Sequence, residues 1–404
     1  MNEHLGQPRH SRRLGPVICV VGARPNFMKM APVLRALAGH LPPLPVLLVH
    51  TGQHYDSDMC DRLFEDLKLP RPDVNLEVGS GSHAVQTAEV MRRFEPLIDI
   101  YEPSCVVVVG DVNSTLACAL VSVKKGIPVV HIEAGLRSND RSMPEEINRI
   151  LTDQISDRLY TTERAAQDNL MREGIPLARI FFAGNVMIDS VQFGRHLARS
   201  ARDTLAHYNK NADVLNHPSG YGVLTLHRPS NVDHPDVLAS LLSVIAEVAV
   251  NLPLVFAMHP RTRNHIEKNN LMSLIDQTRM VLLPPQGYLD MLGLISGAAV
   301  VLTDSGGLQE ETTALGVPCL TLRENTERPI TVEQGTNILV GRSREAILEA
   351  IQEILKGEGK RGHVPEYWDG HAAQRIADDL YRWLQQKAAA TASHLAEFQG
   401  EAHA

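Results

Sequence analysis

The chain has 404 residues, a hydrophobic content of 44%, a formal net charge of −8 and a sequence pI of about 6.1. This length is typical of two or three globular domains with an ample core. The acidic balance argues against a general nucleic-acid or bilayer surface, although a local cationic pocket for a small anion stays open.

The cysteines do not form a disulfide or metal-binding pattern. The five of them are scattered, mostly in or beside apolar segments, and none forms a Cys-x-x-Cys pair: Cys19, Cys60, Cys105, Cys118 and Cys319. This is typical of reduced core residues. The first apolar run, Val17 to Val21, is too short for a signal peptide or a membrane span. We therefore expect a soluble cytoplasmic protein with no membrane partner and no nucleic-acid partner.

The first predicted strand, residues 17–21, leads into a turn that carries two cations. The turn from Gly22 to Lys29 is not a Gly-x-Gly-x-x-Gly fingerprint, and no predicted strand is followed by one. A tightly bound dinucleotide is therefore disfavoured, and we expect no cofactor. Arg24 and Lys29 flank the start of the next helix, where backbone N–H groups favour anions; two solvated cations are the alternative.

Apolar runs continue at regular intervals along the chain. They predict strands at residues 46–49, 105–109, 127–132, 159–162 and 180–183. These runs alternate with helical segments over about 180 residues, which is typical of one doubly wound α/β domain. A polar stretch between Phe193 and Gly220 predicts a hinge. A second series of strands follows at residues 222–226, 254–258, 280–283, 299–303, 319–322 and 337–340.

The two series predict two doubly wound, Rossmann-like α/β domains that face each other across a cleft. We expect residues 1–205 to form the N-terminal domain and residues 206–371 the C-terminal domain. Residues 372–387 predict a closing helix, and residues 388–404 predict a disordered tail. Ligands of such sheets bind at the carboxyl ends of the strands, so the cleft is the expected site.

Three acidic residues converge on the carboxyl edge of the first predicted sheet. Asp111 and Glu133 each follow a predicted strand, and Glu145 opens a helix after a proline. Asp111 has an alternative role as a helix cap. Glu145 could instead complement a helix dipole, or form a surface ion pair with Arg149 on the next turn. Glu133 precedes a glycine and has no helix to cap, and the three acids taken together favour a catalytic site.

The second domain carries a turn of small residues at the end of a strand. Ser305, Gly306 and Gly307 begin a helix there, so that backbone N–H groups can reach a phosphate. Glu311 in that helix would repel a phosphate unless it is aimed sideways, for example at ribose hydroxyls. Arg328, after the next strand, offers a further cation. An ordinary Ser-Gly-Gly connection is the alternative.

Two histidines also end strands of the second domain, His227 and His259. A single histidine is usually a satisfied polar group, but two at strand ends facing three acids indicate acid–base chemistry. A zinc site is the competing interpretation. No His-x-x-Glu-His motif or clustered ligand spacing supports zinc, so we expect no metal.

An ordered set of motifs from about Val17 to Gly341 resembles the non-hydrolysing UDP-N-acetylglucosamine 2-epimerase family, which has the glycosyltransferase-B architecture. The motifs are GARPNFMKMAPV, TGQH, GDVNSTLA, HIEAGLRS, MPEEINR, LHRPSN, TDSGGLQEE and LRENTERP. The resemblance implies catalytic roles for Asp111, Glu133, Glu145 and His227. It implies nucleotide and phosphate contacts from Arg24, Ser305, Gly306, Gly307, Glu311 and Arg328, and it places Lys29, Arg149 and His259 along the cleft.

Some positions depart from the family pattern. Met291 stands where many relatives have an aromatic residue near the uracil. Bacterial relatives that a second substrate molecule activates differ from this chain at the turn Gln53 to Asp56 and near Gly81 and Ser82. The segment His259 to Thr262 also differs from the form common in those relatives.

The resemblance implies a homodimeric isomerase that interconverts UDP-N-acetylglucosamine and UDP-N-acetylmannosamine for surface polysaccharides. It implies elimination of UDP to a 2-acetamidoglucal, followed by readdition of UDP. A glycosyltransferase, an epimerase of a modified UDP-2-acetamido sugar and a catalytically silent sugar-nucleotide sensor are the alternatives. The sensor would not need Asp111, Glu133, Glu145 and His227 together.

Overall fold

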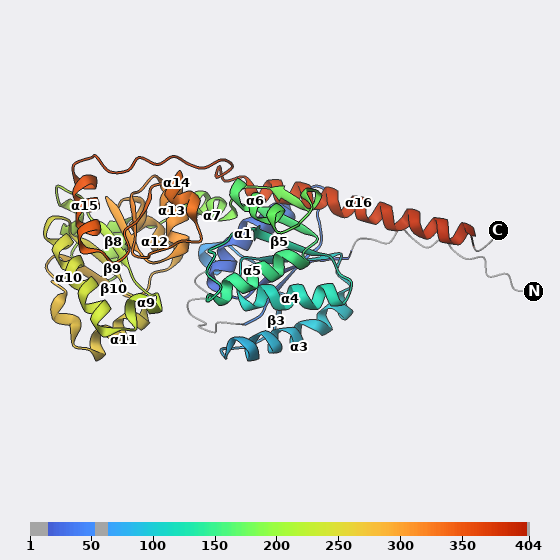
Figure 1. Ribbon diagram of the computed structural model, residues 1–404, viewed down its shortest axis with the longest axis horizontal. Helices are drawn as coiled ribbons and strands as arrows, with labels where there is room; N and C mark the ends of the chain where they lie inside the picture. Colours follow the sequence, from blue (N-terminus) through green and yellow to red (C-terminus); the bar gives the residue numbers. More distant parts are fainter. Residues whose placement is uncertain (1–14, 53–63, 402–404) are drawn as a thin grey trace, which may run out of the picture.

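The computed structural model describes residues 15–52 and 64–401, with side chains described as far as residue 390. Two α/β domains lie side by side, the first coloured from blue to green and the second from yellow to orange (Figure 1). The turn from Gln53 to Asp56 and Cys60 lie outside the described residues. No helix in the described ranges is long and apolar enough to cross a bilayer.

The first domain is built on a parallel sheet of seven strands in the order β3-β2-β1-β4-β5-β6-β7. The strands are β1 (Val17–Val21), β2 (Val46–His50), β3 (Val74–Asn75), β4 (Cys105–Val109), β5 (Val129–Ala134), β6 (Arg158–Thr161) and β7 (Ile180–Phe182). The helices are α1 (Arg24–Gly39), α3 (His83–Tyr101), α4 (Asn113–Lys124), α5 (Pro144–Ile155), α6 (Arg164–Arg172) and α7 (Val186–Arg195). The strand order reverses between β1 and β4, as in a doubly wound fold.

Helices cover both faces of this sheet, which explains why its strands are apolar throughout. In β1, Cys19 packs into a core shared with α1, whereas Ile18 and Val20 pack into a second core with α3 and α4. Successive side chains of a strand point to opposite faces, so a strand buried on both sides needs an unbroken apolar run.

The second domain repeats the design with six parallel strands in the order β10-β9-β8-β11-β12-β13. The strands are β8 (Gly222–Thr225), β9 (Leu254–Ala257), β10 (Met280–Leu283), β11 (Val300–Thr303), β12 (Cys319–Thr321) and β13 (Asn337–Leu339). Its helices are α8 (Ala201–His207), α9 (Pro229–Val232), α10 (Pro235–Asn251), α11 (Pro260–Lys268), α12 (Tyr288–Ser296), α13 (Gly306–Leu315), α14 (Pro329–Glu333) and α15 (Arg344–Leu355). The expectation of two doubly wound parallel α/β sheets is confirmed.

The chain passes from one domain to the other between α7 and α8. Val186 and Met187 of α7 pack in the core of the first domain. Leu205 of α8 packs with Val223 of β8 and Leu294 of α12 in a core of the second domain. The crossing therefore lies within the predicted hinge stretch and upstream of residue 205.

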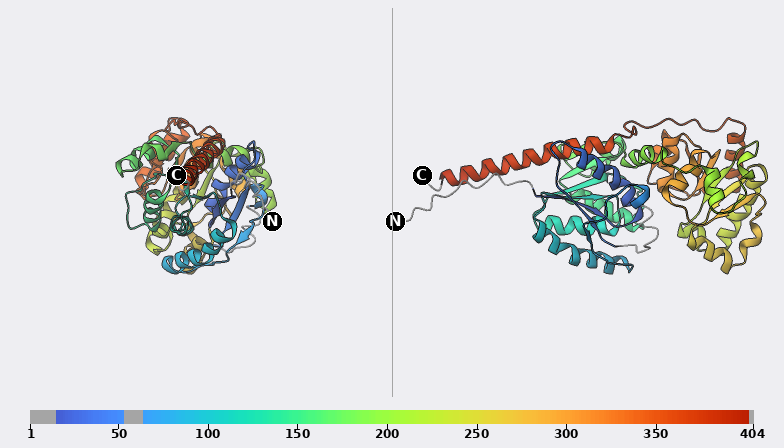
Figure 2. Two further views of the ribbon diagram at one scale, coloured as in Figure 1. Left: turned by 90° about the vertical axis from the view of Figure 1, so that its right-hand side faces the viewer. Right: turned by 180° about the vertical axis from the view of Figure 1, so that it is seen from behind.

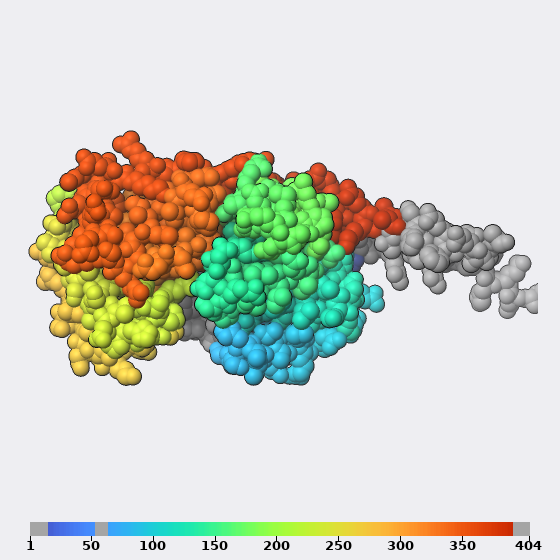
Figure 3. Space-filling model, in the orientation of Figure 1, coloured from blue at the N-terminus to red at the C-terminus, as the bar shows by residue number. Residues whose placement is uncertain are grey.

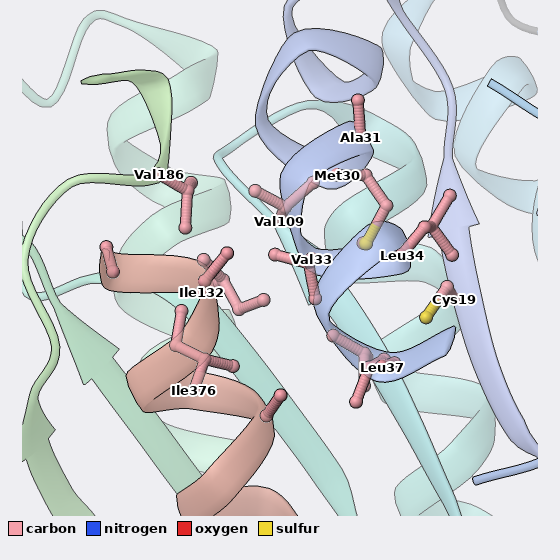
Figure 4. Packing of buried hydrophobic residues seen from close by; sticks show 14 of the residues in the cluster. Cys19, Met30, Ala31, Val33, Leu34, Leu37, Val109, Ile132, Val186 and Ile376 are labelled. Atoms are coloured by element: carbon pink, nitrogen blue, oxygen red, sulfur yellow. The ribbon is translucent and has the colours of Figure 1, made fainter. Parts of the chain in front are cut away.

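α16 (Ala372–Glu401) returns from the second domain and packs on the first. The segment after α15 runs back along the molecule before this helix begins (Figures 1 and 2). Ile376 of α16 lies beside Ile132 of β5 and Val33 of α1 (Figure 4). The closing helix thus completes one face of the first sheet.

The same helix is longer than the sequence analysis expected. The sequence predicts that the helix ends at Lys387 and that a disordered tail follows, whereas the structure continues the helix to Glu401. The added segment is rich in alanine, the strongest helix former, and contains no glycine before Gly400. Local propensity therefore extends the helix past the part that the sheet buries.

Docking of α16 can be tested with Leu380→Ala. Leu380 is fully buried in the first-domain core. Removing a buried leucine side chain leaves a cavity, so we expect the free energy of unfolding to fall by about 2–5 kcal/mol. Urea denaturation followed by circular dichroism measures the change. Gln385→Ala, at an exposed position of the same helix, is the control and should change stability by less than about 0.5 kcal/mol; equal effects of the two substitutions would contradict the packing.

Candidate active site

The switch points of the two sheets border a cleft between the domains. They lie between β1 and β4 in the first sheet and between β8 and β11 in the second, where ligands of open α/β sheets bind. Figure 3 shows the surface indented between the two domains on one face. Side chains meet across this boundary: Arg24 Nη2 donates to the carbonyl of Gln286 at 3.3 Å, and Arg328 Nη2 donates to Glu133 at 2.5 Å.

Glu133 is held in a strained position inside β5. Its φ is 71°, in the left-handed region that residues other than glycine rarely adopt. The register of β5 against β6 shifts between Ile132 and Ala134, as in a β-bulge, and bulges re-aim side chains. A Cβ added to Gly110 would lie 3.3 Å from the Glu133 carboxyl, which therefore sits at the carboxyl end of β4.

Two cations surround the Glu133 carboxylate. Lys29 of α1 donates to Oε2, and Arg328 of the second domain donates to Oε1 at 2.5 Å. Burial raises the pKa of Glu133, but Lys29 and Arg328 outweigh burial and leave the pKa below its ordinary value. Glu133 is thus a buried carboxylate at neutral pH, and the charge of Lys29 is directed at Glu133.

Asp111 and Glu146 are joined by one arginine. Arg149 donates to the Asp111 carboxylate through Nη2 and to Glu146 through Nη1, both at 2.7 Å. Asp111 therefore does not cap α4, whose N-cap is Val112. Glu146 also accepts hydrogen bonds from two backbone N–H groups of the loop after β5. The ion pair of Glu145 with Arg149, an alternative left open by the sequence, does not form, because the arginine reaches Glu146 instead.

Glu145 itself is the second residue of α5 and is half-buried. Its side chain makes no hydrogen bond or ion pair with the described part of the chain. Since a general acid or base must be able to reach a substrate, an acid without a structural partner at a helix start beside Arg149 suits that role.

His227 is oriented by a buried acid. Its Nδ1 lies 2.8 Å from Asp304, whose carboxylate also accepts hydrogen bonds from the backbone N–H groups of His227 and Arg228. These bonds overcome burial and lower the pKa of Asp304. The His227 side chain is 37% exposed, so its other nitrogen is available for proton transfer.

His259 lies near His227 but has a structural task of its own. The two rings are 5.8 Å apart, and His259 Nδ1 accepts a hydrogen bond from the backbone of Arg261 at the start of α11. Burial and the nearby His227 lower the pKa of His259. His259 is therefore a neutral neighbour of the cleft at pH 7.

The Ser-Gly-Gly turn begins α13, as the sequence analysis expected. Ser305 is the N-cap residue and makes no side-chain capping bond, so its hydroxyl is not used by the helix. A Cβ on Gly306 would lie 2.5 Å from Glu327 Oε1, so a larger residue there would displace the Glu327 side chain. A Cβ on Gly307 would have its nearest neighbour, Met187 Cε, at 3.9 Å. The arrangement leaves backbone N–H groups at the helix start for an anion.

Two acids follow on α13, Glu310 and Glu311, and both are buried. Burial raises the pKa of Glu311 to about 8, although Arg24 opposes this. Glu311 is therefore neutral at pH 7 and does not repel a phosphate by charge. The sequence analysis raised the concern that Glu311 would repel a phosphate at the start of α13. A neutral Glu311 removes that concern.

Sequence reasoning missed several partners in the site. Asp304 and Glu310 both stand in quoted motifs, but nothing in a linear pattern says that one orients His227 and the other contacts Arg328. Asn26 is a third: its side chain donates to the carbonyl of Val109 at 2.9 Å and so ties the β1–α1 turn to β4. The polar residues directly beside each predicted site residue were the available signal.

Within residues 15–52 and 64–390, no three His, Cys, Asp or Glu side chains lie close enough together to hold a metal ion. What the cleft brings together is carboxylates, a histidine and cations around a glycine-rich helix start. Two Rossmann-like domains with such a cleft define an enzyme that applies acid–base chemistry to an anionic, nucleotide-like ligand.

The family model for UDP-N-acetylglucosamine 2-epimerase matches residues 40–381. UDP-N-acetylglucosamine 2-epimerase of Methanocaldococcus jannaschii is 41% identical over 88% of this chain and 96% of its own. UDP-2,3-diacetamido-2,3-dideoxy-D-glucuronate 2-epimerase of Pseudomonas aeruginosa is 40% identical over 90% of this chain and 99% of its own. The chain therefore belongs to the UDP-N-acetylglucosamine 2-epimerase family and is an enzyme of the isomerase class, as expected.

A solved structure supports the same assignment. The crystal structure of the Methanocaldococcus jannaschii enzyme in complex with UDP-GlcNAc and UDP superposes with a TM-score of 0.78. Sequence identity in that comparison is 39%, over 91% of this chain and 99% of the other. The glycosyltransferase-B arrangement expected from the resemblance is thereby confirmed.

The raised pKa of Glu311 predicts a pH-dependent affinity for UDP. Below about pH 8 the carboxyl is neutral, and above it the ionised carboxylate repels the diphosphate. We expect the Kd for UDP to rise by about tenfold between about pH 7 and pH 9 in the wild type. Isothermal titration calorimetry measures it. Glu311→Gln cannot ionise and is the control; the same pH dependence in both proteins would contradict this role.

Proposed function

We propose that this protein epimerises C2 of UDP-N-acetylglucosamine to give UDP-N-acetylmannosamine, for surface polysaccharide precursors. The observation that carries the proposal is the joint presence, at one cleft, of Glu133 paired with Arg328 and of His227 paired with Asp304. Family membership and the complex of a 39% identical relative with UDP-GlcNAc and UDP support the substrate. Incubation with UDP-N-acetylglucosamine alone, with products identified by proton NMR, tests it.

A modified UDP-2-acetamido sugar is the second candidate substrate. The observation that favours it is the 40% identity with the Pseudomonas aeruginosa enzyme, nearly the same as the 41% identity with the Methanocaldococcus jannaschii enzyme. Both names describe inversion at C2 and differ in the groups at C3 and C6. Parallel assays with the two sugars, compared by kcat/KM, separate these candidates.

Elimination of UDP is the mechanism that this site supports best. C2 of the sugar is not next to a carbonyl, so simple deprotonation by Glu or His is too unfavourable. Loss of the anomeric UDP as the C2 proton leaves avoids a carbanion, and the start of α13 with Arg328 is suited to hold the departing diphosphate. Readdition of UDP to the 2-acetamidoglucal, with protonation from the other face, completes the inversion.

Acid–base groups from both walls of the cleft suit a proton that leaves one face and returns to the other. Asp111, Glu133 and Glu145 come from the first domain, and His227 comes from the second. Transfer on opposite faces needs two groups on opposite sides of the sugar ring. We assign the two sides to the two domains.

A glycosyltransferase would use the same architecture and diphosphate site. It would need an acceptor and would release UDP as a final product, whereas an epimerase returns UDP to the sugar. The membership of the chain in an epimerase family favours the epimerase. Accumulation of UDP without any C2 epimer in the absence of an acceptor would favour the transferase.

A homodimer and a cytoplasmic location complete the proposal. The free cysteines Cys19, Cys105, Cys118 and Cys319 are buried and unpaired, which suits a reducing compartment. Val85 and Ile100 expose apolar side chains on α3, at 60% and 67%, and are candidates for a subunit contact. Sedimentation equilibrium of the wild type and of a Val85→Lys, Ile100→Lys variant tests the dimer.

Four substitutions test the catalytic assignment: Asp111→Asn, Glu133→Gln, Glu145→Gln and His227→Asn. Each removes a proton-transfer group, and the three acid-to-amide changes keep the shape of the side chain, so we expect turnover to fall by about 10²–10⁴-fold. The affinity for UDP should change much less, because none of the four is assigned to the diphosphate. Initial rates by NMR and Kd by calorimetry provide both numbers. Turnover like that of the wild type in any two variants would refute the assignment.

Isotope labels test elimination directly. If the C2 proton is lost to an enzyme group and replaced, solvent deuterium should enter C2 of the product. If the C1–O–P bond breaks, oxygen-18 placed in that bridge should move into non-bridging phosphate positions. Both should occur without added NAD, and mass spectrometry with phosphorus NMR measures them. Retention of the original hydrogen at C2, or dependence on nicotinamide, would overturn the mechanism even where epimerisation occurs.

A further inference from the structure

Glu310 is a buried acid at the cleft that the predicted site does not contain. It is 1% exposed and belongs to α13, the helix whose start is suited to a phosphate. Its Oε1 accepts a hydrogen bond from Asn185 Nδ2 at 2.8 Å and lies 3.0 Å from Arg328 Nε. Asn185 is the N-cap of α7, so Glu310 also links the two domains.

Two acidic side chains contact the guanidinium of Arg328. Its Nε lies 3.0 Å from Glu310 Oε1 in an ion pair that is not aligned as a hydrogen bond, and its Nη2 donates to Glu133 Oε1 at 2.5 Å. The guanidinium is planar and rigid, so an ion pair that restrains Nε also restrains the direction of both Nη groups. The contact with Glu310 therefore aims the rest of the guanidinium at Glu133 and the cleft.

The charges around Arg328 fit this arrangement. Burial lowers the pKa of Arg328, but Glu310 and Glu133 outweigh burial and raise it, so the arginine stays charged. Burial raises the pKa of Glu310 above its ordinary value, and Arg328 opposes that rise without cancelling it. Arg328 thus pairs with two buried acids at once. The two acids compete for the same guanidinium, so each weakens the pairing of Arg328 with the other.

We propose that Glu310 is a positioning residue that holds Arg328 by Nε, directs its Nη groups toward Glu133 and the leaving diphosphate, and so acts through Arg328. This inference rests on the proposed epimerisation and extends it to a residue with no direct contact to the reacting atoms. In Glu310→Gln the side chain keeps its size but can no longer carry a negative charge. The guanidinium can then turn fully onto Glu133, which withholds both groups from the substrate.

The test is a double-mutant cycle of Glu310→Gln with Arg328→Lys, because a lysine cannot make both contacts. We expect Glu310→Gln to lower kcat by about tenfold and to change KM by less than about threefold. In the Arg328→Lys protein, Glu310→Gln should lower kcat by less than about twofold, since the residue it acts through is gone. A wild-type kcat for Glu310→Gln, or the full tenfold loss in both backgrounds, would overturn the proposal.

A matched control separates positioning from stability. Asp379 is a buried acid that pairs with Arg158 at 2.7 Å outside the cleft. Asp379→Asn should lower the melting temperature and leave kcat unchanged, whereas Glu310→Gln should lower kcat at temperatures where the protein is folded.

Crystal structures keep the proposal testable if the wild type fails to epimerise UDP-N-acetylglucosamine, which would refute the proposed function alone. In Glu310→Gln, Arg328 should turn away from residue 310 and make a second contact with Glu133. An unchanged Arg328 side chain in that structure would overturn the inference.

Discussion

The pairing of Glu133 with Lys29 and Arg328 is the interaction on which the cleft depends. A buried carboxylate without partners is strongly unfavourable, and removing one member of a buried ion pair typically costs about 3–5 kcal/mol. Here one partner comes from the first domain and the other from the second. Glu133 therefore has both of its cationic partners only when the two domains are together, so the geometry of the site depends on how close the domains are.

The backbone conformation at Glu133 also helps to position its carboxylate. A φ of 71° at Glu133 is unfavourable for a residue with a side chain, and such strain persists where the surrounding structure over-determines it. The surroundings here include His131, which lies on the same strand and is fully buried. One of its ring nitrogens lies 2.8 Å from the carbonyl of Gly110 and the other 2.7 Å from Asp153 of α5. β4, β5 and α5 are thus tied together behind the site; Asp111 follows β4, Glu133 lies in β5 and Glu145 lies in α5.

The sequence predicted the sheets well because burial on both faces leaves a local signal. Runs such as Cys105 to Val109 can be read without knowing what packs on them. The rule that ligands bind at strand ends then placed Asp111, Glu133, His227 and Ser305 at one cleft. Side-chain pairing was not predictable in this way. Arg149 lies four residues from Glu145 and three from Glu146, and both spacings face each other on a helix, so only the loop held by Glu146 decides between them.

Protonation state was equally beyond a linear reading, since the same residue type behaves in opposite ways a few ångströms apart. Two cations contact Glu133 and lower its pKa. Burial raises the pKa of Glu311 to about 8, and Arg24 is the cation that opposes this rise. One carboxyl is thus charged and the other neutral at pH 7. Both states suit a site that releases and recaptures a diphosphate, because an ionised acid can take a proton whereas an ionised carboxylate beside the phosphates would repel UDP. The distribution of cations, more than the number of acids, therefore separates the proton-transfer side of the cleft from the nucleotide side.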